Sequence, residues 1–238
     1  MDPRYAVAYP QLYAHHWWWR VREQILVRKV ETLLSGSREA RILDVGCGAG
    51  LLFDALQAFG HVEGVEADAA AVSRSGRWRE RISVGNLDDE FAPAGPYDLI
   101  LMLDVLEHIA GPGHVLRRAG RLLRPNGRIL ITVPAFSWLW TSHDEINHHV
   151  TRYSAAELRA LVAASGLVTL ESQYLFQSLV AAKLFVRALE AISSAAPRVP
   201  GIPPPPLNAM IQTWFCGEHA LLGWLPFGTS TLAVAAAG

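Results

Sequence analysis

Short apolar runs alternate with stretches of helical spacing through the middle of the chain. The apolar runs predict strands at residues 41–45, 61–66, 81–84, 97–103, 127–133 and 167–175. Between them, apolar residues recur every three or four positions and predict helices near 50–59, 69–79, 112–123 and 154–165. Strands that alternate with helices form a mostly parallel sheet with helices on both faces. The pattern therefore predicts an α/β fold.

The pattern changes after the sixth predicted strand. An amphipathic helix is predicted at 176–195, and a second helical segment at about 207–223. The Pro-rich stretch 197–206 lies between them and is incompatible with a helix, so we expect Pro203 to Pro206 to be extended. Residues 230–235 then predict a closing strand.

Composition and charge exclude several classes of protein. A net charge of −1 over 238 residues gives no field that would favour nucleic acid. The two cysteines, Cys47 and Cys216, provide no disulfide framework, which favours a reducing compartment. No uninterrupted apolar window is long enough to span a bilayer, and the N-terminus lacks the apolar core of a signal peptide. We therefore expect a cytoplasmic protein.

The strongest chemical signal is the segment Asp44–Gly50, which joins a predicted strand to a predicted helix. Its glycines, at alternate positions 46, 48 and 50, allow a sharp turn and let a ligand approach main-chain N–H groups. Twenty residues after Gly46 the next strand ends on Glu66, whose carboxylate can accept two ribose hydroxyls. A Gly-rich turn and an acid at the next strand end predict a nucleoside-binding crevice.

Read in full, Asp44-Val45-Gly46-Cys47-Gly48-Ala49-Gly50 closely resembles motif I of the class I S-adenosylmethionine (SAM)-dependent methyltransferases. Residues 97–108 resemble the fourth strand of that family and the turn after it. Residues 122–131 resemble its "LLkPGG" turn into strand five, with Asn126 in place of the usual first glycine. The resemblance implies a Rossmann-like, seven-stranded, mostly parallel sheet whose antiparallel last strand inserts between strands five and six.

On this resemblance, the chain divides into four parts. They are N-terminal lid helices (1–40), a SAM-binding core (41–175), a helical cap insertion (176–228) and the closing strand of the core sheet (229–238).

The resemblance also implies SAM as the cofactor and S-adenosylhomocysteine as the product. The implied cofactor-binding residues are Arg20, Asp44, Gly46, Cys47, Gly48, Gly50, Glu66, Ala67, Asn86, Leu87, Leu103, Asp104 and His108. Asn86 stands where the family often has an aspartate that reads adenine, and Asp88 competes for this role. For His108 the alternative is a structural role in the turn. Arg20 and Arg22 follow a tryptophan cluster that resembles a lid helix of the same family, and core packing is the alternative for that cluster.

A second informative segment, 134–153, follows the fifth strand and is rich in histidines, acids and aromatic residues. Such a segment beside a cofactor predicts an acceptor pocket. We expect His143 or His149 to act as base, with Asp144 orienting it. The alternative is that His149 and Arg152 form a structural network. The predicted substrate-binding residues are Trp17, Phe136, Trp140, His148, Arg152 and Tyr153.

The sequence thus predicts a SAM-dependent methyltransferase that acts on a small, hydrophobic or lipid-like acceptor, with O-methylation favoured. The alternative is a non-catalytic SAM-binding protein that uses its amphipathic helices for dimer or membrane contact. We expect peripheral membrane contact, no nucleic acid partner, and a monomer or homodimer. We expect no metal, because the segment after strand four lacks a compact acidic cluster beyond Asp104 and Glu107 and no metal-ligand spacing is present.

Overall fold

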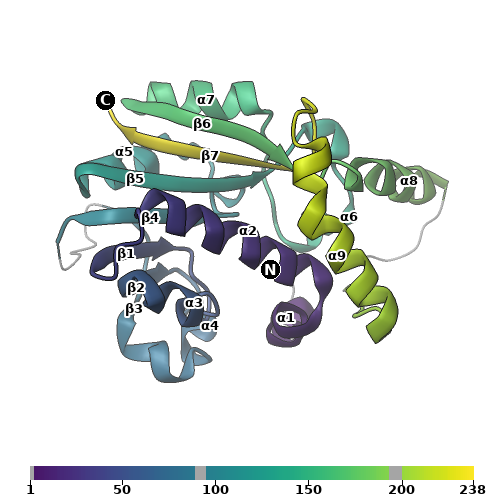
Figure 1. Ribbon diagram of the computed structural model, residues 1–238, viewed down its shortest axis with the longest axis horizontal. Helices are drawn as coiled ribbons and strands as arrows, with labels where there is room; N and C mark the ends of the chain where they lie inside the picture. Colours follow the sequence, from purple (N-terminus) through teal and green to yellow (C-terminus); the bar gives the residue numbers. More distant parts are fainter. Residues whose placement is uncertain (1–2, 89–94, 193–199) are drawn as a thin grey trace.

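A single seven-stranded sheet forms the centre of the protein (Figure 1). The computed structural model describes residues 3–88, 95–192 and 200–238. The strands are β1 (Ala40–Val45), β2 (Gly60–Glu66), β3 (Ile82–Val84), β4 (Tyr97–Leu103), β5 (Leu123–Pro134), β6 (Leu167–Leu175) and β7 (Ser230–Ala237). Their order in the sheet is β3-β2-β1-β4-β5-β7-β6, and β7 runs antiparallel to both β5 and β6. The predicted fold, including the insertion of the last strand, is confirmed.

Successive residues of the central strands point to opposite faces of the sheet and fill two separate cores. Ile42 and Leu101 pack in one core, whereas Leu43 and Ile100 pack in the other. The helices that contribute to the first core are α2 (Trp17–Leu33), α3 (Phe53–Leu56) and α9 (Pro205–Leu222). The helices that contribute to the second are α5 (Gly113–Arg121) and α7 (Ala155–Ala164). Both faces are therefore covered, as a mostly parallel sheet requires.

The remaining helices are shorter or lie beside the sheet. They are α1 (Pro3–His15), α4 (Ala69–Ser73), α6 (Ser142–Ile146) and α8 (Leu179–Ile192). Short 3₁₀ helices are η1 (Gln57–Phe59), η2 (Gly76–Arg81), η3 (Leu106–His108) and η4 (Ser137–Leu139). The helices predicted near 50–59 and 69–79 are thus each a short α-helix followed by a short 3₁₀ helix. Segment 134–153 contains the short helix α6, which begins with a capping box between Thr141 and Asp144.

The capping box expected at the start of α7 is present. The hydroxyl oxygen of Ser154 accepts a hydrogen bond from the backbone N–H of Glu157, and the carboxylate of Glu157 accepts one from the backbone N–H of Ser154. The side chains thus satisfy two N–H groups that the first turn of a helix leaves without intrahelical acceptors.

The expectation that Pro203 to Pro206 are all extended is wrong. Helix α9 begins at Pro205, and Pro204 is its N-cap residue. Proline lacks a backbone N–H, but the N–H groups of the first helical turn have no intrahelical acceptor in any case, so proline fits there without loss. Residues 200–204 are not helical; the rest of the predicted Pro-rich break, 197–199, lies outside the described residues.

Helices α8 and α9 lie together at one end of the sheet, on the right in Figure 1. Helix α9 packs against α2, where the rings of Trp17 and Phe215 stack with centroids 4.6 Å apart. The side chain of Asn208 accepts a hydrogen bond from the backbone N–H of Trp17 and donates one to the carbonyl of His15. Within the described residues, no helix is both long enough and apolar enough to cross a bilayer.

Candidate active site

A large cavity lies along the carboxyl ends of β1, β2 and β4, the edge at which open α/β sheets bind ligands. Helices α1, α2 and α8 contribute side chains to its other walls. Its volume is about 1490 Å³. Sites for one small ligand usually measure ~300–1,000 Å³, so this cavity has room for two molecules side by side.

The turn after β1 forms one wall of the cavity. Gly46, Gly48 and Gly50 all have positive φ, at 69°, 57° and 70°, which is a backbone conformation that favours glycine. A Cβ on Gly46 would lie 2.7 Å from Cγ2 of Val105, in the turn after β4. The turn after β1 therefore packs against the turn after β4 with no space for a side chain between them.

Glu66, at the end of β2, holds this turn in place. Its Oε2 accepts a hydrogen bond from the backbone N–H of Gly48 at 2.8 Å, and its Oε1 accepts one from the backbone N–H of Asp68 at 2.8 Å. Each carboxylate oxygen has a second lone pair. Glu66 lines the cavity, so it is positioned to accept two further hydrogen bonds from a ligand.

Asp44 is buried beneath the same turn. Desolvation raises the pKa of its carboxyl to about 7; the charge of Arg22 opposes this shift, and the charge of Glu66 adds to it. Asp44 is therefore a carboxylate whose charge changes near neutral pH.

Arg22 reaches the cavity from α2 and pairs with Asp104 at the end of β4. Its Nη2 lies 2.8 Å from Oδ2 of Asp104 and donates a hydrogen bond to the hydroxyl of Thr132. Thr132 in turn donates to Oδ1 of Asp104 at 3.0 Å. Asp104 has a φ of 58°, which turns the chain sharply at the end of the strand. Arg20, by contrast, pairs with Glu23 at 2.8 Å. Of the two arginines that the sequence suggested, Arg22 is the one that lines the cavity.

A second polar cluster surrounds Asp144, which belongs to α6 and lines the same cavity. Oδ1 of Asp144 lies 2.8 Å from Nδ1 of His149, and Nη1 of Arg152 donates to both carboxylate oxygens at 2.8 and 2.9 Å. The backbone N–H of Thr141 donates to Oδ2. Burial opposes ionisation of Asp144, but the hydrogen bond from His149 and the charge of Arg152 outweigh it and hold the pKa of this carboxyl well below its usual range. Asp144 is thus a fixed negative charge that orients His149.

The other candidate base, His143, has a different environment. Desolvation, followed by the charge of Lys183, lowers the pKa of His143 to about 4. Its Nε2 lies 3.2 Å from the side-chain nitrogen of Asn147, and its ring packs edge-on against Tyr5. His143 is therefore neutral at physiological pH and a weaker base than an ordinary histidine.

The predicted site residues fall into two groups. Those that line the cavity are Trp17, Gly46, Cys47, Gly48, Glu66, Ala67, Asn86, Leu87, Leu103, Asp104, His108, His143, Asp144, His149 and Arg152. Those that do not line it are Arg20, Asp44, Gly50, Phe136, Trp140, His148 and Tyr153. Phe136 stacks on Trp138 and Tyr174, and Tyr153 packs in the second core. These two aromatic residues support the loop after β5 instead of lining the cavity.

The structure adds lining residues that the sequence did not single out. Tyr5 and Tyr9 come from α1, and Lys183 and Glu190 come from α8. Glu190 accepts hydrogen bonds from the backbone and hydroxyl of Ser142, so α8 is tied to the start of α6. Burial, followed by the charge of Arg152, lowers the pKa of Lys183 to about 8. The amphipathic pattern predicted α8, but it gave no sign of which polar residues turn inward.

Comparison with known proteins places this fold in a family. The methyltransferase domain family matches residues 17–172, which is more than half of the chain. The chain belongs to this family. Its fold is that of the class I SAM-dependent methyltransferases, and SAM is the cofactor of this class.

Relatives and solved structures support the assignment at different levels. The ubiquinone biosynthesis O-methyltransferase of Nitrosococcus oceani is 32% identical over 149 residues, which cover 56% of this chain and 62% of that protein. The chain thus spans about three fifths of the length of this curated relative. A chain of the complex between the Haloferax volcanii Trm112 methyltransferase activator and a methyltransferase aligns with a TM-score of 0.60 at 19% identity, over 98% of this chain and 94% of that one.

The [4+2]-cyclase SpnF aligns with a TM-score of 0.59 at 17% identity, over 99% of this chain and 94% of that one. At such low identity these two structures show the fold alone. Because one of them is named a cyclase, the chemistry must be argued from the side chains of the cavity.

Proposed function

We propose that this protein transfers the methyl group of SAM to a hydroxyl oxygen of a small, hydrophobic acceptor. The observation that carries the proposal is one continuous cavity that is lined both by the glycine turn with Glu66 and by the Asp144–His149 pair. Methyl transfer is an in-line displacement, so it requires cofactor and acceptor side by side. The curated relative from Nitrosococcus oceani is named an O-methyltransferase, which favours oxygen as the acceptor atom.

We place SAM against the turn after β1. In this arrangement Glu66 accepts the ribose hydroxyls, and Asn86 and Leu87 border the adenine. The methionine part of SAM lies toward Asp104 and Arg22. There the ammonium group of SAM meets the carboxylate of Asp104, and the carboxylate group of SAM meets the guanidinium of Arg22. The lining residues Gly46, Cys47, Gly48, Ala67 and Leu103 complete the contact with the cofactor.

We place the acceptor at the Asp144 cluster. A hydroxyl must lose its proton to become a good nucleophile, and His149 takes part in this step. Asp144 engages Nδ1 of His149, which leaves Nε2 for other partners. This arrangement favours His149 over His143, whose pKa is lowered to about 4.

The side chains around the mouth of the cavity favour an apolar acceptor. Helix α8 lines the cavity with Leu179, Val186 and Leu189, and the side chain of Phe185 on the same helix is 65% exposed. The exposed apolar residues of α9 are Leu207, Met210, Trp214 and Leu221, which recur at helical spacing and form one stripe. We infer that these helices touch a lipid surface from which a lipid-like acceptor enters.

The test is a transfer assay with methyl-labelled SAM and matched acceptors. The panel pairs an alkyl-substituted phenol or catechol with its methyl ether, which has no free hydroxyl, and with the unsubstituted ring. We expect label on the oxygen of the alkyl-substituted compound and none on its ether. Label on ring carbon instead of oxygen, or SAM binding without any transfer across the panel, would overturn the proposal. His149→Gln should lower kcat by about 10²–10⁴-fold while SAM affinity is retained.

A further inference from the structure

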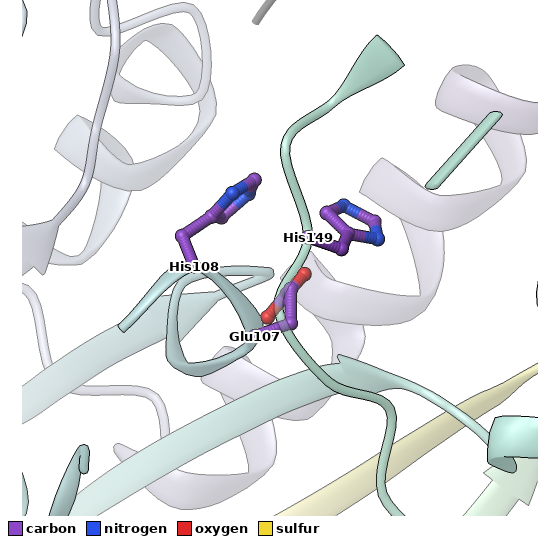
Figure 2. A group of neighbouring side chains, drawn as sticks. All are labelled: Glu107, His108 and His149. Atoms are coloured by element: carbon purple, nitrogen blue, oxygen red, sulfur yellow. The ribbon is translucent and has the colours of Figure 1, made fainter. Parts of the chain in front are cut away.

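Three side chains with metal-binding atoms meet at the acceptor end of the cavity. Glu107 and His108 belong to the turn η3 after β4, and His149 follows α6, so two segments far apart in the sequence bring them together (Figure 2). One ligand atom from each residue lies within 4.8 Å of the others. Atoms that bind a common metal ion at ~2.0–2.2 Å lie ~3–4 Å apart, so small side-chain rotations would close this group around an ion.

The state of Glu107 points to a missing partner. The residue is fully buried, with 0% of its surface exposed, and neither carboxylate oxygen has a hydrogen-bond partner among the residues that the structure describes. Buried carboxylates are normally paired with a cation or hydrogen-bonded, because burial of an uncompensated charge is costly. Figure 2 shows the carboxylate beside the imidazole rings of His108 and His149. A cation between the three groups would supply the partner that Glu107 lacks.

The environment of His149 is that of a metal-binding histidine. In metal sites one ring nitrogen binds the ion while the other donates to a carboxylate, which fixes the ring and its tautomer. Nδ1 of His149 lies 2.8 Å from Asp144, and Arg152 fixes Asp144 in turn. Nε2 of His149 is therefore the nitrogen available to an ion. His108 is exposed and lines the cavity, so an ion at this site would also be open to a ligand.

We propose that Glu107, His108 and His149 bind one divalent transition-metal ion, Zn²⁺ or Mn²⁺, at the acceptor end of the cavity. Two imidazoles and one carboxylate favour such ions over Mg²⁺ and Ca²⁺, which prefer oxygen ligands alone. Three protein ligands leave at least one position for an acceptor oxygen. The proposal departs from the expectation, made from the sequence, that no metal is used. That expectation rested on the spacing of residues within short segments, and such spacing does not reveal ligands that come from separate segments.

The role of the ion rests on the proposed function. A hydroxyl bound to the ion has a lowered pKa and loses its proton to solvent. The resulting oxyanion attacks the methyl carbon of SAM. The O–C bond forms, the C–S bond breaks, and its electron pair stays on sulfur, which turns the sulfonium into a neutral thioether. His149 then contributes to deprotonation as a ligand of the ion.

The test measures metal binding directly, without SAM or acceptor. Untagged full-length protein is treated with a chelator, dialysed, and titrated calorimetrically with ZnCl₂, MnCl₂ and MgCl₂. We expect one equivalent of Zn²⁺ or Mn²⁺ to bind, and Mg²⁺ to bind at least tenfold more weakly. Glu107→Gln keeps the shape of the buried side chain, and His108→Ala changes an exposed residue, so both variants should fold. Each should weaken binding by at least about 100-fold.

The control is His148→Asn. His148 is exposed, does not line the cavity, and has a φ of 58° that asparagine tolerates. It should leave metal affinity unchanged. No stoichiometric binding by the wild-type chain, or equal affinities in wild type, Glu107→Gln and His108→Ala, would overturn the metal site. Metal binding without transfer to any acceptor would overturn the proposed function alone, whereas hydroxyl methylation by metal-free protein would overturn the role of the ion alone.

Discussion

Among single side chains, Asp144 determines how the acceptor end of the cavity is built. Its side chain and that of Arg152 are only 1% and 2% exposed, so loss of the carboxylate charge would leave a buried guanidinium without compensation. We predict that Asp144→Asn lowers the free energy of unfolding by about 3–5 kcal/mol, as measured by urea denaturation. Because the pKa of Asp144 is lowered in the fold, its stabilisation is present above the unfolded-chain pKa of ~3.9 and is lost as the pH falls through the folded-state pKa.

The matched control is Asp54→Asn. Asp54 also pairs with an arginine, Arg77, but both side chains are 64% exposed. Water and salt screen such a pair, so the loss should stay below about 1 kcal/mol. If Asp144→Asn and Asp54→Asn lowered the free energy of unfolding equally, burial would not determine how much the Asp144–Arg152 pair stabilises the fold.

Asp44 should make cofactor binding depend on pH. Its pKa is raised to about 7, so the carboxyl is mostly protonated at pH 6 and mostly ionised at pH 7.5. Asp44 does not line the cavity, so its charge acts on the ammonium group of the cofactor from beneath the glycine turn. When only the ionised form supports binding, affinity for S-adenosylhomocysteine should rise roughly eightfold over this interval. Calorimetry at several pH values measures the change. Asp44→Asn should bind more weakly with no such rise, and an unchanged rise in this variant would assign the titration to another group.

Glu66 should contribute to cofactor affinity through both of its oxygens. Glu66→Gln replaces one acceptor oxygen with an amide NH₂ group. This group cannot accept the hydrogen bond from the backbone N–H that the oxygen accepted, and it cannot accept one from a ribose hydroxyl. We predict that SAM binding weakens by about 1–3 kcal/mol, or roughly 5–150-fold, in a calorimetric titration. Glu63→Gln is the control, because Glu63 lies on the same strand and pairs with Arg41 away from the cavity. A similar loss in both variants would contradict a specific role for Glu66.

The sequence predicted the cavity residues that stand at the end of a strand. It did not predict the cavity residues that depend on how helices pack against the sheet. Glu66 is the last residue of β2 and Asp104 directly follows β4, so the topology alone places them at the ligand edge. Tyr5 and Lys183 line the same cavity from α1 and α8, but an amphipathic pattern does not say what a helix faces. Arg20 and Arg22 differ by two positions on α2, and only the docking of that helix decides which one enters the cavity.

Among the contacts between secondary-structure elements, the turns after β1 and β4 leave the least space for a change of side chain. We predict that Gly46→Ala weakens SAM binding at least tenfold, because its φ of 69° disfavours alanine and its Cβ would lie 2.7 Å from Val105. Gly48→Ala separates the effect of backbone conformation from that of the steric clash. Gly48 also has a positive φ, of 57°, but its Cβ would meet no atom within 4 Å. Adding Val105→Ala should restore part of the affinity of Gly46→Ala and none of that of Gly48→Ala. Equal behaviour of both glycine variants would mean that backbone conformation alone is responsible.

The boundaries of elements were the least predictable feature, for reasons specific to each. Proline is a helix breaker only where an N–H is needed, so a run of prolines did not reveal that α9 starts inside it at Pro205. Helix α6 has only five residues, Ser142–Ile146, which is too short for a periodic pattern. Its stability comes from the capping box and from Glu190 of α8, a contact between distant parts of the chain.

The architecture of the whole molecule was predicted by the alternation of strands and helices, and the strand order was implied by the family resemblance. Nothing in the apolar pattern of residues 230–235 shows that β7 lies between β5 and β6; that came from the resemblance. The two cores follow from the alternation of side chains between the two faces of the sheet along β1 and β4. The cavity could not be predicted in size, because it depends on how α1, α2 and α8 dock around the edge of the sheet.

The proposed membrane contact involves the outer surface of α8 and α9 together. Exposed fractions are 65% for Phe185 on α8, 62% for Leu221 on α9 and 77% for Trp224, two residues after the end of α9, so the described part of the chain leaves most of each apolar side chain uncovered. Of the two basic residues of α8, Lys183 lines the cavity, and Arg187, which donates to the carbonyl of Trp138, is the one basic residue on the exposed side of this helix. We therefore predict binding to zwitterionic vesicles that changes little with salt, because buried apolar area and not attraction to anionic lipids drives it.

Liposome flotation measures this binding. The double variant Phe185→Ser and Trp224→Ser removes two side chains that contribute ~1.5–3 kcal/mol each when fully buried, and it should reduce the bound fraction at least tenfold. Val168→Ser with Leu170→Ser is the matched control, since these residues are 49% and 50% exposed at the start of β6, at the end of that strand away from α8. Binding that requires anionic lipid, or an equal loss in both double variants, would contradict an apolar contact through α8 and α9. The protein would then meet a water-soluble acceptor in solution, and the exposed stripe of α9 would need a protein partner.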